Sequence, residues 1–540
     1  MTNREIYYKH WIDEEADILA RLDHPPYVIN TGMAISGLIH IGKCRSDLLC
    51  PGALAIRLEN LGKNVKHYLT LYTQDPFKAK PPLVKSDFAE AYRGVRILDV
   101  PCPEDCCESW VEHFLDPFRS ALPCFEIHPI MITTTEMYRM PKMKKMIRVI
   151  MEKREEIRKI ANRFRGEAKK PPGWIPFNPL CNKCHAISPE FTEALSINLE
   201  NWTVEYQCKK CEDHGVSNME MGKLDWRLEW AAIWHVLDVD FEPFGKDHAM
   251  AGGSRESCSA LAKEALGFEP PRGQPFEFVA MLIDGKSIEM TSSGGVSFDF
   301  DEWPKVAEPE VLKYWYLIMK PMKHLEFNPS RIPYLVNEYD RAEAAYFGIE
   351  EPQDSQIALA MKRSYELAHN ETPPEEVPIQ VPYDHAAMVS QIVPALSDQK
   401  AVLKVLRRTI HIPTEASEER IKYVLERIRR AYYWTMKYAP ARDRIRILPE
   451  ISEDVKRQLR EREKQALGLL ADSLEARTWT PVDLKAEIYR IAREVAKISP
   501  KRFFQITYLV FFGQKSGPQI APFILSLDDE FVVERLRELC

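Results

Sequence analysis

Apolar residues fall into short runs and helical periods along the first part of the chain. Residues 27–31 (YVINT) are rich in β-branched side chains and predict a buried strand. Apolar positions then recur at helical spacing from Leu48 to Ile56, and Gly62 is suited to end that helix in a left-handed conformation. Residues 64–72 (NVKHYLTLY) predict a second buried strand. Strand, helix and strand in this order indicate a βαβ unit with two parallel strands.

The pattern changes twice further along the chain. Residues 238–242 and residues 277–283 are again strand-like, so we expect the parallel sheet to resume after an intervening stretch. Beyond about residue 353 the pattern is helical, as in residues 419–434 (ERIKYVLERIRRAYYW) and residues 482–497 (VDLKAEIYRIAREVAK). The chain therefore predicts an α/β fold that carries an insertion and is followed by an all-α region.

Composition fits several globular domains. The 540 residues include 45% hydrophobic and 28% charged residues, which excludes a wholly disordered, collagen-like or coiled-coil chain. A chain of this length predicts about three or four domains. No apolar run approaches the roughly 18 residues of a membrane-spanning helix, and the N-terminal sequence lacks the apolar segment of a signal peptide. We therefore expect a soluble, cytoplasmic protein that has no membrane partner.

The net charge of −7 conceals two basic stretches. Residues 141–170 contain twelve Lys and Arg against four Asp and Glu, and residues 401–450 contain twelve against six. Such runs are most often solvated helix faces. Two of them in an acidic chain also suit a polyanionic partner, and charge alone does not decide between these interpretations.

Seven of the twelve cysteines lie in two tight groups. In the first, the CxxC pairs Cys181/Cys184 and Cys208/Cys211 are separated by 23 residues of strand-like sequence. This doubled spacing is typical of a tetrahedral Zn²⁺ site with four thiolates, and four unrelated buried thiols would not explain it. We therefore predict a structural zinc ribbon.

The second group consists of Cys102, Cys106 and Cys107, followed by His113. If the segment EDCCESWVEHF, residues 104–114, begins a helix, the histidine comes within reach of the thiols, and the four residues can bind a second Zn²⁺. Two or three buried free thiols are the alternative. Neither group offers the open position and general base of a catalytic zinc site, so both predicted sites are structural.

The turn after the first strand has features of an anion site. It contains Gly37 and Gly42, which leave the backbone open to a ligand, and His40, which can donate to a phosphate oxygen. The helix that follows presents unpaired N–H groups and a positive dipole end. The pattern is neither GxGxxG nor a P-loop, and by itself His-x-Gly is a weak motif.

Longer segments identify a family. SGLIHIGK resembles the HIGH motif of class I aminoacyl-tRNA synthetases, and MTSSGG, residues 290–295, resembles their KMSKS loop. DWRLEW, FGKDHAMAGGS and GPQIAPF are similar to segments of class I lysyl-tRNA synthetases in particular. VPCPEDCCESWVEHF also fits, because that family carries metal ligands at these spacings, and this favours a second zinc ion. The resemblance spans nearly the whole chain in the right order.

The resemblance implies a class I Rossmann-type parallel sheet with a zinc-bearing insertion and an all-α C-terminal anticodon-binding region. Residues 1–125 would form the first half of the catalytic domain with one metal site, and residues 126–220 the basic insertion with the zinc ribbon. Residues 221–352 would form the second half with the KMSKS-like loop and a connecting fold. Residues 353–540 would form a helical anticodon-binding cage.

The implied reaction has two steps. Lysine and ATP, with Mg²⁺, give lysyl-adenylate, and the lysyl group then passes to tRNA(Lys). Such catalysis depends on positioning and on charge stabilisation more than on acid–base chemistry. We expect a monomer that binds lysine and tRNA(Lys).

The resemblance also implies functional residues. For ATP binding they are Ser36, Gly37, His40 and Gly42. For catalysis they are His40, Gly42, Lys43, Lys286, Met290, Ser292 and Ser293. For amino-acid binding they are Gly32, Trp226, Asp247, His248 and Phe276. In the cage region, the basic and aromatic residues Arg429, Arg430, Trp434 and Lys437 suit contact with unpaired tRNA bases and phosphates, although such aromatics also commonly pack helices.

The sequence departs from its family at the loop. Relatives usually have Lys at the first position of KMSKS, where this chain has Glu289, and the second lysine of the motif is also missing. A carboxylate there would repel pyrophosphate. Lys286 lies upstream, and Lys43 follows His-Ile-Gly where relatives have Asn, His or Thr. Our hypothesis is that Lys43 replaces part of the missing charge; a solvated surface lysine is the alternative.

The amino-acid pocket departs as well. Ala34 and Phe276 stand where relatives commonly have Thr and Tyr, so two hydroxyl groups are lost. Two alternatives to a lysine–tRNA ligase therefore stay open. One is a divergent paralogue that activates another amino acid or uses another acceptor, and the other is a catalytically dead tRNA-binding protein.

Overall fold

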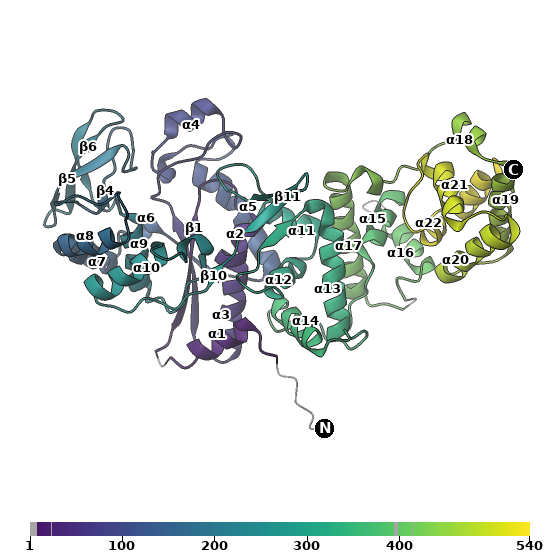
Figure 1. The fold of residues 1–540 in the computed structure, drawn as a ribbon, viewed down its shortest axis with the longest axis horizontal. Helices are drawn as coiled ribbons and strands as arrows, with labels where there is room; N and C mark the ends of the chain where they lie inside the picture. The colour runs from purple at the N-terminus through teal and green to yellow at the C-terminus, as the bar shows by residue number, and fades with distance from the viewer. Residues whose placement is uncertain (1–7, 23, 394–397, 414, 540) are drawn as a thin grey trace, which may run out of the picture. The chain divides into compact units, whose positions relative to one another are not determined.

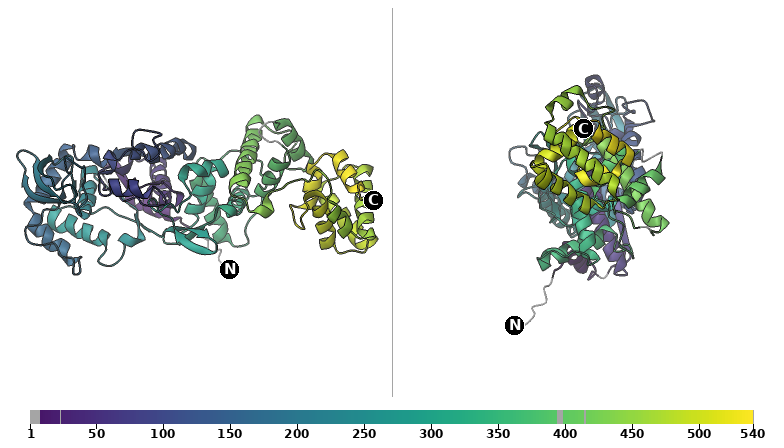
Figure 2. Two further views of the ribbon diagram at one scale, coloured as in Figure 1. Left: turned by 90° about the horizontal axis from the view of Figure 1, so that it is seen from above. Right: turned by 90° about the vertical axis from the view of Figure 1, so that its right-hand side faces the viewer.

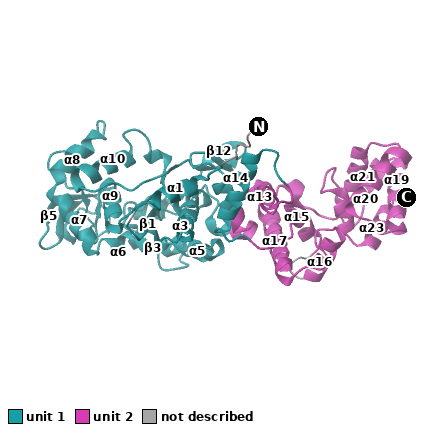
Figure 3. Cartoon of the chain, turned by 90° about the horizontal axis from the view of Figure 1, so that it is seen from below, with its two compact units in different colours: residues 1–303, 312–328, 351–373 teal, residues 304–311, 329–350, 374–540 magenta. Residues whose placement is uncertain are grey.

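The structure is a computed structural model that describes residues 8–22, 24–393, 398–413 and 415–539. The chain forms two compact units (Figure 3). Unit 1 consists of Met1–Trp303, Leu312–Asn328 and Glu351–Pro373, and unit 2 of Pro304–Val311, Pro329–Glu350 and Pro374–Cys540. The finer division into four regions that the sequence suggested stays a prediction.

A parallel sheet forms the centre of unit 1 (Figure 1). Strands β1 (Tyr27–Ala34), β2 (Val65–Tyr72) and β3 (Ile130–Thr133) pair in parallel in the order β1-β2-β3. The runs of buried residues in β1 and β2 are expected of strands that are covered on both faces. The predicted strands at residues 27–31 and 64–72 are therefore confirmed.

The sheet continues past the free edge of β1. The N–H of Asn30 donates to the carbonyl oxygen of Phe241, which places residues 240–242 beside β1. Strand β9 (Phe244–Gly245) then pairs in parallel with β10 (Pro275–Phe276). The predicted return of the chain to the parallel sheet near residues 238–242 is confirmed, and so is the α/β class.

The connection between β1 and β2 is helical, as its apolar period predicts. Helix α2 (Ile41–Cys44) continues through a π-helical segment (Arg45–Leu49) into α3 (Cys50–Asn60). Gly62 follows with φ of +75°, a conformation that a residue without a Cβ atom adopts at little cost. The chain then turns directly into β2.

The strand-like segment at residues 277–283 does not join the parallel sheet. Strand β11 (Val279–Ile283) pairs antiparallel with β12 (Lys286–Glu289) and parallel with β13 (Leu325–Phe327). The turn between β11 and β12 holds Asp284 and Gly285, both with positive φ, which favours a tight hairpin. The strand is confirmed, but its expected place in the parallel sheet is wrong, because the hairpin provides β11 with a local partner.

The insertion combines helices and a small antiparallel sheet. Most of the basic stretch forms the amphipathic helices α7 (Pro141–Glu152) and α8 (Arg154–Arg163), which bury apolar side chains and expose charged ones. Strands β5 (Thr192–Asn198), β6 (Thr203–Cys208) and β7 (His214–Asn218) form the sheet β5-β6-β7. Figure 1 shows β5 and β6 together at the end of unit 1.

Unit 2 is built from helices, and its described residues contain no strand. Its long helix α17 (Glu418–Lys437) packs against α15 (Tyr383–Ile392). The last helices, α19 (Glu461–Ala476), α21 (Pro500–Phe512) and α23 (Asp529–Arg537), form a group that Figure 2 shows in yellow tones. The predicted all-α C-terminal region is confirmed. Among the described residues, no helix is both long and apolar enough to cross a membrane.

Candidate active site

A cavity of about 340 Å³ lies at the carboxyl ends of β1 and β2 in unit 1. Ala34 and Tyr72, the last residues of these strands, both line it. Ligands of open α/β sheets bind outside the carboxyl ends of the strands, so this is the expected place for a site. Many of the residues that the sequence assigned to function line this cavity: Gly32, His40, Gly42, Lys43, Trp226, Asp247, His248, Phe276 and Met290.

The other predicted residues of the two motifs lie outside the cavity wall. They are Ser36, Gly37, Lys286, Ser292 and Ser293. Gly37 is nevertheless packed against the backbone of Ser292, so the turn after β1 contacts the loop after β12. The Sδ atom of Met290 would lie 3.2 Å from a Cβ atom on Gly42. Lys286 is exposed on β12. The structure thus brings the HIGH-like and KMSKS-like segments together, as their resemblance implies.

His40 is the N-cap residue of α2 and is buried. Its Nδ1 atom accepts a hydrogen bond from the N–H of Lys43 at 3.2 Å. The neutral ring must therefore carry its hydrogen on Nε2, where it can act as a donor. Burial, assisted by the charge of Lys43, lowers the pKa of His40 to about 3. At neutral pH this side chain is an uncharged donor and not a cation.

Aromatic rings form one wall of the cavity. Trp226 and Trp230, both on α9 (Trp226–Leu237), stack with ring centroids 5.2 Å apart. The ring of His248 lies 5.2 Å from Trp226 and 5.3 Å from Trp230. Asp247 Oδ2 is 3.6 Å from His248 Nδ1, while burial lowers the pKa of His248. Such a wall can pack an alkyl chain and attract a cation.

Carboxylates line much of the remaining wall, and most of them were missed from the sequence. Glu242 is buried and accepts hydrogen bonds from the indole N–H groups of Trp230, at 2.9 Å, and Trp234. Burial raises the pKa of Glu242 to about 7. The other acidic residues of the wall are Asp47, Asp75, Asp247, Glu277 and Glu289. Asp75 closely follows the predicted strand at residues 64–72, and Glu242 is the last residue of the predicted strand at residues 238–242, which was the available signal.

Two further residues of the wall have structural partners. The Arg45 guanidinium donates to the carbonyl oxygens of Glu277 at 3.3 Å, Lys320 at 2.9 Å and Lys323 at 3.0 Å. It therefore holds backbone segments together and is not a free cation. The ring of Tyr72 packs on Gly32, where an added Cβ atom would lie 2.8 Å from Cε2.

The first cysteine group is assembled at one end of the ribbon. The Sγ atoms of Cys181 and Cys211 are 3.5 Å apart, and those of Cys184 and Cys208 are 3.6 Å apart. All four sulfur atoms lie within 4.8 Å of one another. Tetrahedral Zn²⁺ with Zn–S bonds of about 2.3 Å requires separations of about 3.8 Å, so the donor set fits a zinc ion.

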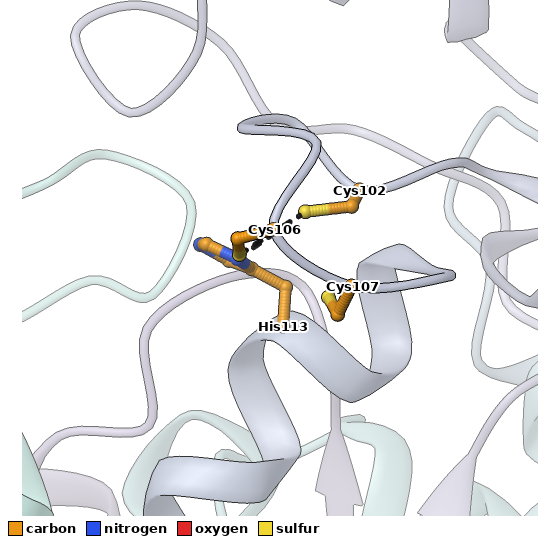
Figure 4. Close-up of side chains that lie close together, drawn as sticks. All are labelled: Cys102, Cys106, Cys107 and His113. Carbon is orange, nitrogen blue, oxygen red and sulfur yellow. Dashed lines mark hydrogen bonds between the residues drawn. The ribbon is translucent and has the colours of Figure 1, made fainter.

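The second group is also assembled (Figure 4). Cys102, Cys106 and Cys107 lie on the loop before α5 (Trp110–Phe125), and His113 lies in the first turn of that helix. His113 Nδ1 is 3.5 Å from Cys102 Sγ and 3.2 Å from Cys106 Sγ, and all four donor atoms lie within 4.8 Å. Three thiols and one imidazole fit the ligand set of a structural zinc site.

The predicted tRNA residues of unit 2 divide into two pairs. Trp434 is buried and its indole N–H donates to the carbonyl oxygen of Pro329 at 2.8 Å. Arg430 donates to the carbonyl oxygen of Pro304 at 3.2 Å and lies 3.6 Å from Glu308. These two side chains are anchored within the unit. Arg429 and Lys437 are exposed on α17.

A parallel sheet with a HIGH-like turn and a KMSKS-like loop at its carboxyl edge defines the catalytic domain of a class I aminoacyl-tRNA synthetase. The family model for tRNA synthetases class I (K) matches residues 9–371. The chain belongs to this family, which confirms the resemblance noted in the sequence.

Relatives match along nearly the whole chain. The lysine–tRNA ligase of Aeropyrum pernix is 36% identical over 540 residues, which cover 98% of this chain and 97% of the relative. That of Methanocaldococcus jannaschii is 31% identical and covers 97% of this chain and 99% of the relative. The lysine–tRNA ligase of Pyrococcus horikoshii is 32% identical, and the match covers 98% of this chain and 99% of the relative.

Proposed function

We propose that this chain is a lysine–tRNA ligase that activates lysine with ATP and transfers the lysyl group to tRNA(Lys). One observation carries the proposal. A single cavity at the carboxyl edge of the sheet gathers the turn at His40 and Gly42, the loop residue Met290 and the aromatic wall around Trp226. The family and the full-length similarity to lysine–tRNA ligases support the same conclusion.

In the first step, a carboxylate oxygen of lysine attacks the α-phosphorus of ATP and pyrophosphate leaves. Ser36, Gly37 and Gly42 form the turn on which the nucleotide would lie, and the Nε2–H of His40 would donate to a phosphate oxygen. The positions of Ser292 and Ser293, on the loop that packs against Gly37, suit contact with the leaving pyrophosphate. Mg²⁺ bound with ATP would supply additional charge neutralisation.

The charge of the cavity supports a cationic amino acid. Lysine carries two ammonium groups, and the wall offers six carboxyl groups together with the rings of Trp226, Trp230 and His248. The alkyl chain can pack on the rings, and an ammonium group can interact with their faces or with a carboxylate. Asp247 and His248 would orient the amino acid, and Phe276 and Gly32 would shape its pocket.

The charge and surface of unit 2 suit tRNA recognition. Arg429 and Lys437 are exposed cations on α17, and cations of this kind supply sequence-independent attraction to phosphates. A second cavity, of about 650 Å³, lies near the buried Trp434 and is lined in part by Arg331, Tyr334 and His411. An unpaired anticodon base could stack there on the half-exposed ring of Tyr334.

Both cysteine groups would hold structural Zn²⁺. In the ribbon, the metal would join the two CxxC turns, and in the second group it would tie the loop before α5 to the first turn of that helix. Neither ion would take part in the reaction. The cytoplasmic location and the monomeric state stay predictions from the sequence.

The test is ATP–pyrophosphate exchange with each of the twenty amino acids, with and without total tRNA. Exchange with lysine alone, followed by lysylation of tRNA, is the expected result. Exchange with a different amino acid would contradict the proposal and identify the chain as a paralogue that activates that amino acid. Absence of exchange with retained tRNA binding would identify a catalytically dead tRNA-binding protein.

A further inference from the structure

Lys43 is a half-buried cation whose ammonium group has one hydrogen-bond acceptor. Its Nζ atom donates to the carbonyl oxygen of Ala34 at 2.8 Å, which leaves two of the three ammonium hydrogens for other partners. Among the described residues, no carboxylate forms an ion pair with it within 4.0 Å. Burial lowers the pKa of Lys43, while Asp47 and Asp75 support its charge from a longer distance.

The neighbouring acids have other partners. Asp47 accepts a hydrogen bond from Ser46 Oγ at 2.8 Å, and burial raises its pKa to about 6. The charge of Lys43 acts in the opposite direction on this pKa, but burial outweighs it, and no ion pair joins the two side chains within 4.0 Å. Asp75 is paired with the buried Lys223, which also pairs with Glu229 at 2.9 Å. Within the part of the chain that the structure describes, Lys43 therefore forms no close ion pair, and Asp47 and Asp75 act on its charge only at longer range.

An ammonium group that is partly removed from water without a close ion pair loses hydration, and such groups are concentrated at functional sites. Here the group lies in the wall of the cavity, so an anion that enters the cavity can pair with it. The reaction brings two kinds of anion, the carboxylate of the amino acid and the phosphates of ATP. The position of Lys43 decides between them.

Lys43 is held at the end of β1, in the part of the cavity near Gly32 and Ala34. Met290 of the KMSKS-like loop also lines this cavity, but Ser292 and Ser293, the loop residues suited to contact pyrophosphate, lie outside its wall, where Ser292 packs on the turn at Gly37. The hypothesis from the sequence assigned Lys43 to the pyrophosphate. Its bond to Ala34 places it instead beside the residues to which the resemblance assigns the amino acid.

We propose that Lys43 binds the α-carboxylate of the amino-acid substrate and holds it in line with the α-phosphorus of ATP. This inference rests on the proposed function. A carboxylate oxygen forms the new O–P bond, the bridging P–O bond between the α and β phosphates breaks, and pyrophosphate leaves with the electron pair. Lys43 stays protonated throughout, and its remaining hydrogen can reach an α-phosphate oxygen.

The end of β1 offers the substrate no side-chain hydroxyl group, because its last residue is Ala34, which holds Lys43 through its carbonyl oxygen. A charge-assisted hydrogen bond from Lys43 to the carboxylate would therefore orient the substrate at this strand end.

The experiment measures binding of lysine and of lysinamide, which lacks the carboxylate, by calorimetry in the absence of ATP. Lys43→Gln keeps a donor for Ala34 but removes the charge. Lys66→Gln, on the exposed amino end of β2, is the matched control. The wild type and Lys66→Gln should prefer lysine over lysinamide about tenfold to hundredfold, and Lys43→Gln should lose most of that preference.

Several results would overturn the proposal. One is that Lys43→Gln still prefers lysine over lysinamide as strongly as the wild type does. Another is that this preference is unchanged but ATP binds more weakly, which would indicate that Lys43 contacts the phosphates of ATP. If Lys43→Gln fails to fold by circular dichroism, Lys43→Asn, whose shorter amide side chain is also uncharged, replaces it. If the wild type binds no lysine, the proposed function fails, and the same comparison is made with the amino acid that supports exchange and its amide.

Discussion

The carbonyl oxygen of Ser292 lies against Gly37, so close that a Cβ atom on Gly37 would overlap with it. The Cδ2 atom of Leu83 would lie only 2.5 Å from the same Cβ atom, and Gly37 has φ of +145°. Glycine is required at this position both for its conformation and for the absence of a side chain. The contact keeps the KMSKS-like loop next to the turn on which we place ATP.

Gly37→Ala should therefore reduce adenylate formation at least tenfold. An alanine must displace the Ser292 backbone and adopt a strained φ, which also lowers the free energy of unfolding by about 1–3 kcal/mol. ATP–pyrophosphate exchange measures the first effect and urea unfolding the second.

Gly62→Ala separates backbone strain from the loop contact. Gly62 also has a positive φ, of +75°, but nothing lies within 4 Å of the position of its Cβ atom. This variant should lose about 1 kcal/mol of stability and retain exchange. If Gly37→Ala is as active as Gly62→Ala, the contact between Gly37 and Ser292 has no role in the reaction.

Metal analysis of the purified chain should find two Zn²⁺ ions. Cys208→Ser removes a thiolate from the ribbon and Cys106→Ser removes one from the group before α5, so each variant should retain one ion. Cys124→Ser is the control, because this exposed thiol belongs to neither group and its loss should leave both ions in place. If the wild type contains one ion and only Cys208→Ser loses it, the ribbon binds that ion and the second group consists of free thiols without metal.

Features set by local spacing could be predicted, and those set by distant contacts could not. The strand at Tyr27, the helix end at Gly62 and the cysteine groups all follow from residues that are close in sequence. The bond between Lys43 and Ala34 depends on how a helix end meets a strand end. The burial of Trp434 depends on Pro329, more than one hundred residues away.

The stacked histidines of unit 2 should make its stability depend on pH. His385 and His411 lie 3.9 Å apart and both contact Thr409 Oγ1, at 3.1 Å and 2.9 Å. Burial lowers the pKa of His385 from 6.5 to about 3 and also lowers that of His411. Both are neutral in the folded chain at pH 7.

A histidine with a lowered pKa binds protons more readily in the unfolded chain. Stability is therefore fully present above pH 6.5 and is lost as the pH falls toward the folded pKa of about 3. For His385 alone the loss should reach about 2 kcal/mol between pH 6.5 and 5. In urea unfolding, the stability of wild type relative to His385→Gln should fall over this interval, and a constant difference would contradict the assignment.

Two arginines on the same helix should respond to the same substitution with very different losses of stability. Arg427 is buried on α17, and its guanidinium contacts Glu308 at 3.0 Å and Asp340 at 2.9 Å. Arg427→Met leaves two buried carboxylates without this partner and should cost about 3–5 kcal/mol in urea unfolding. Arg429 pairs with Glu426 at the exposed surface, so Arg429→Met should cost less than about 1 kcal/mol. In filter binding, however, Arg429→Met should weaken tRNA binding. The salt dependence of binding should fall by an amount that corresponds to about one phosphate contact. Equal binding by wild type and Arg429→Met would show that Arg429 does not contact tRNA.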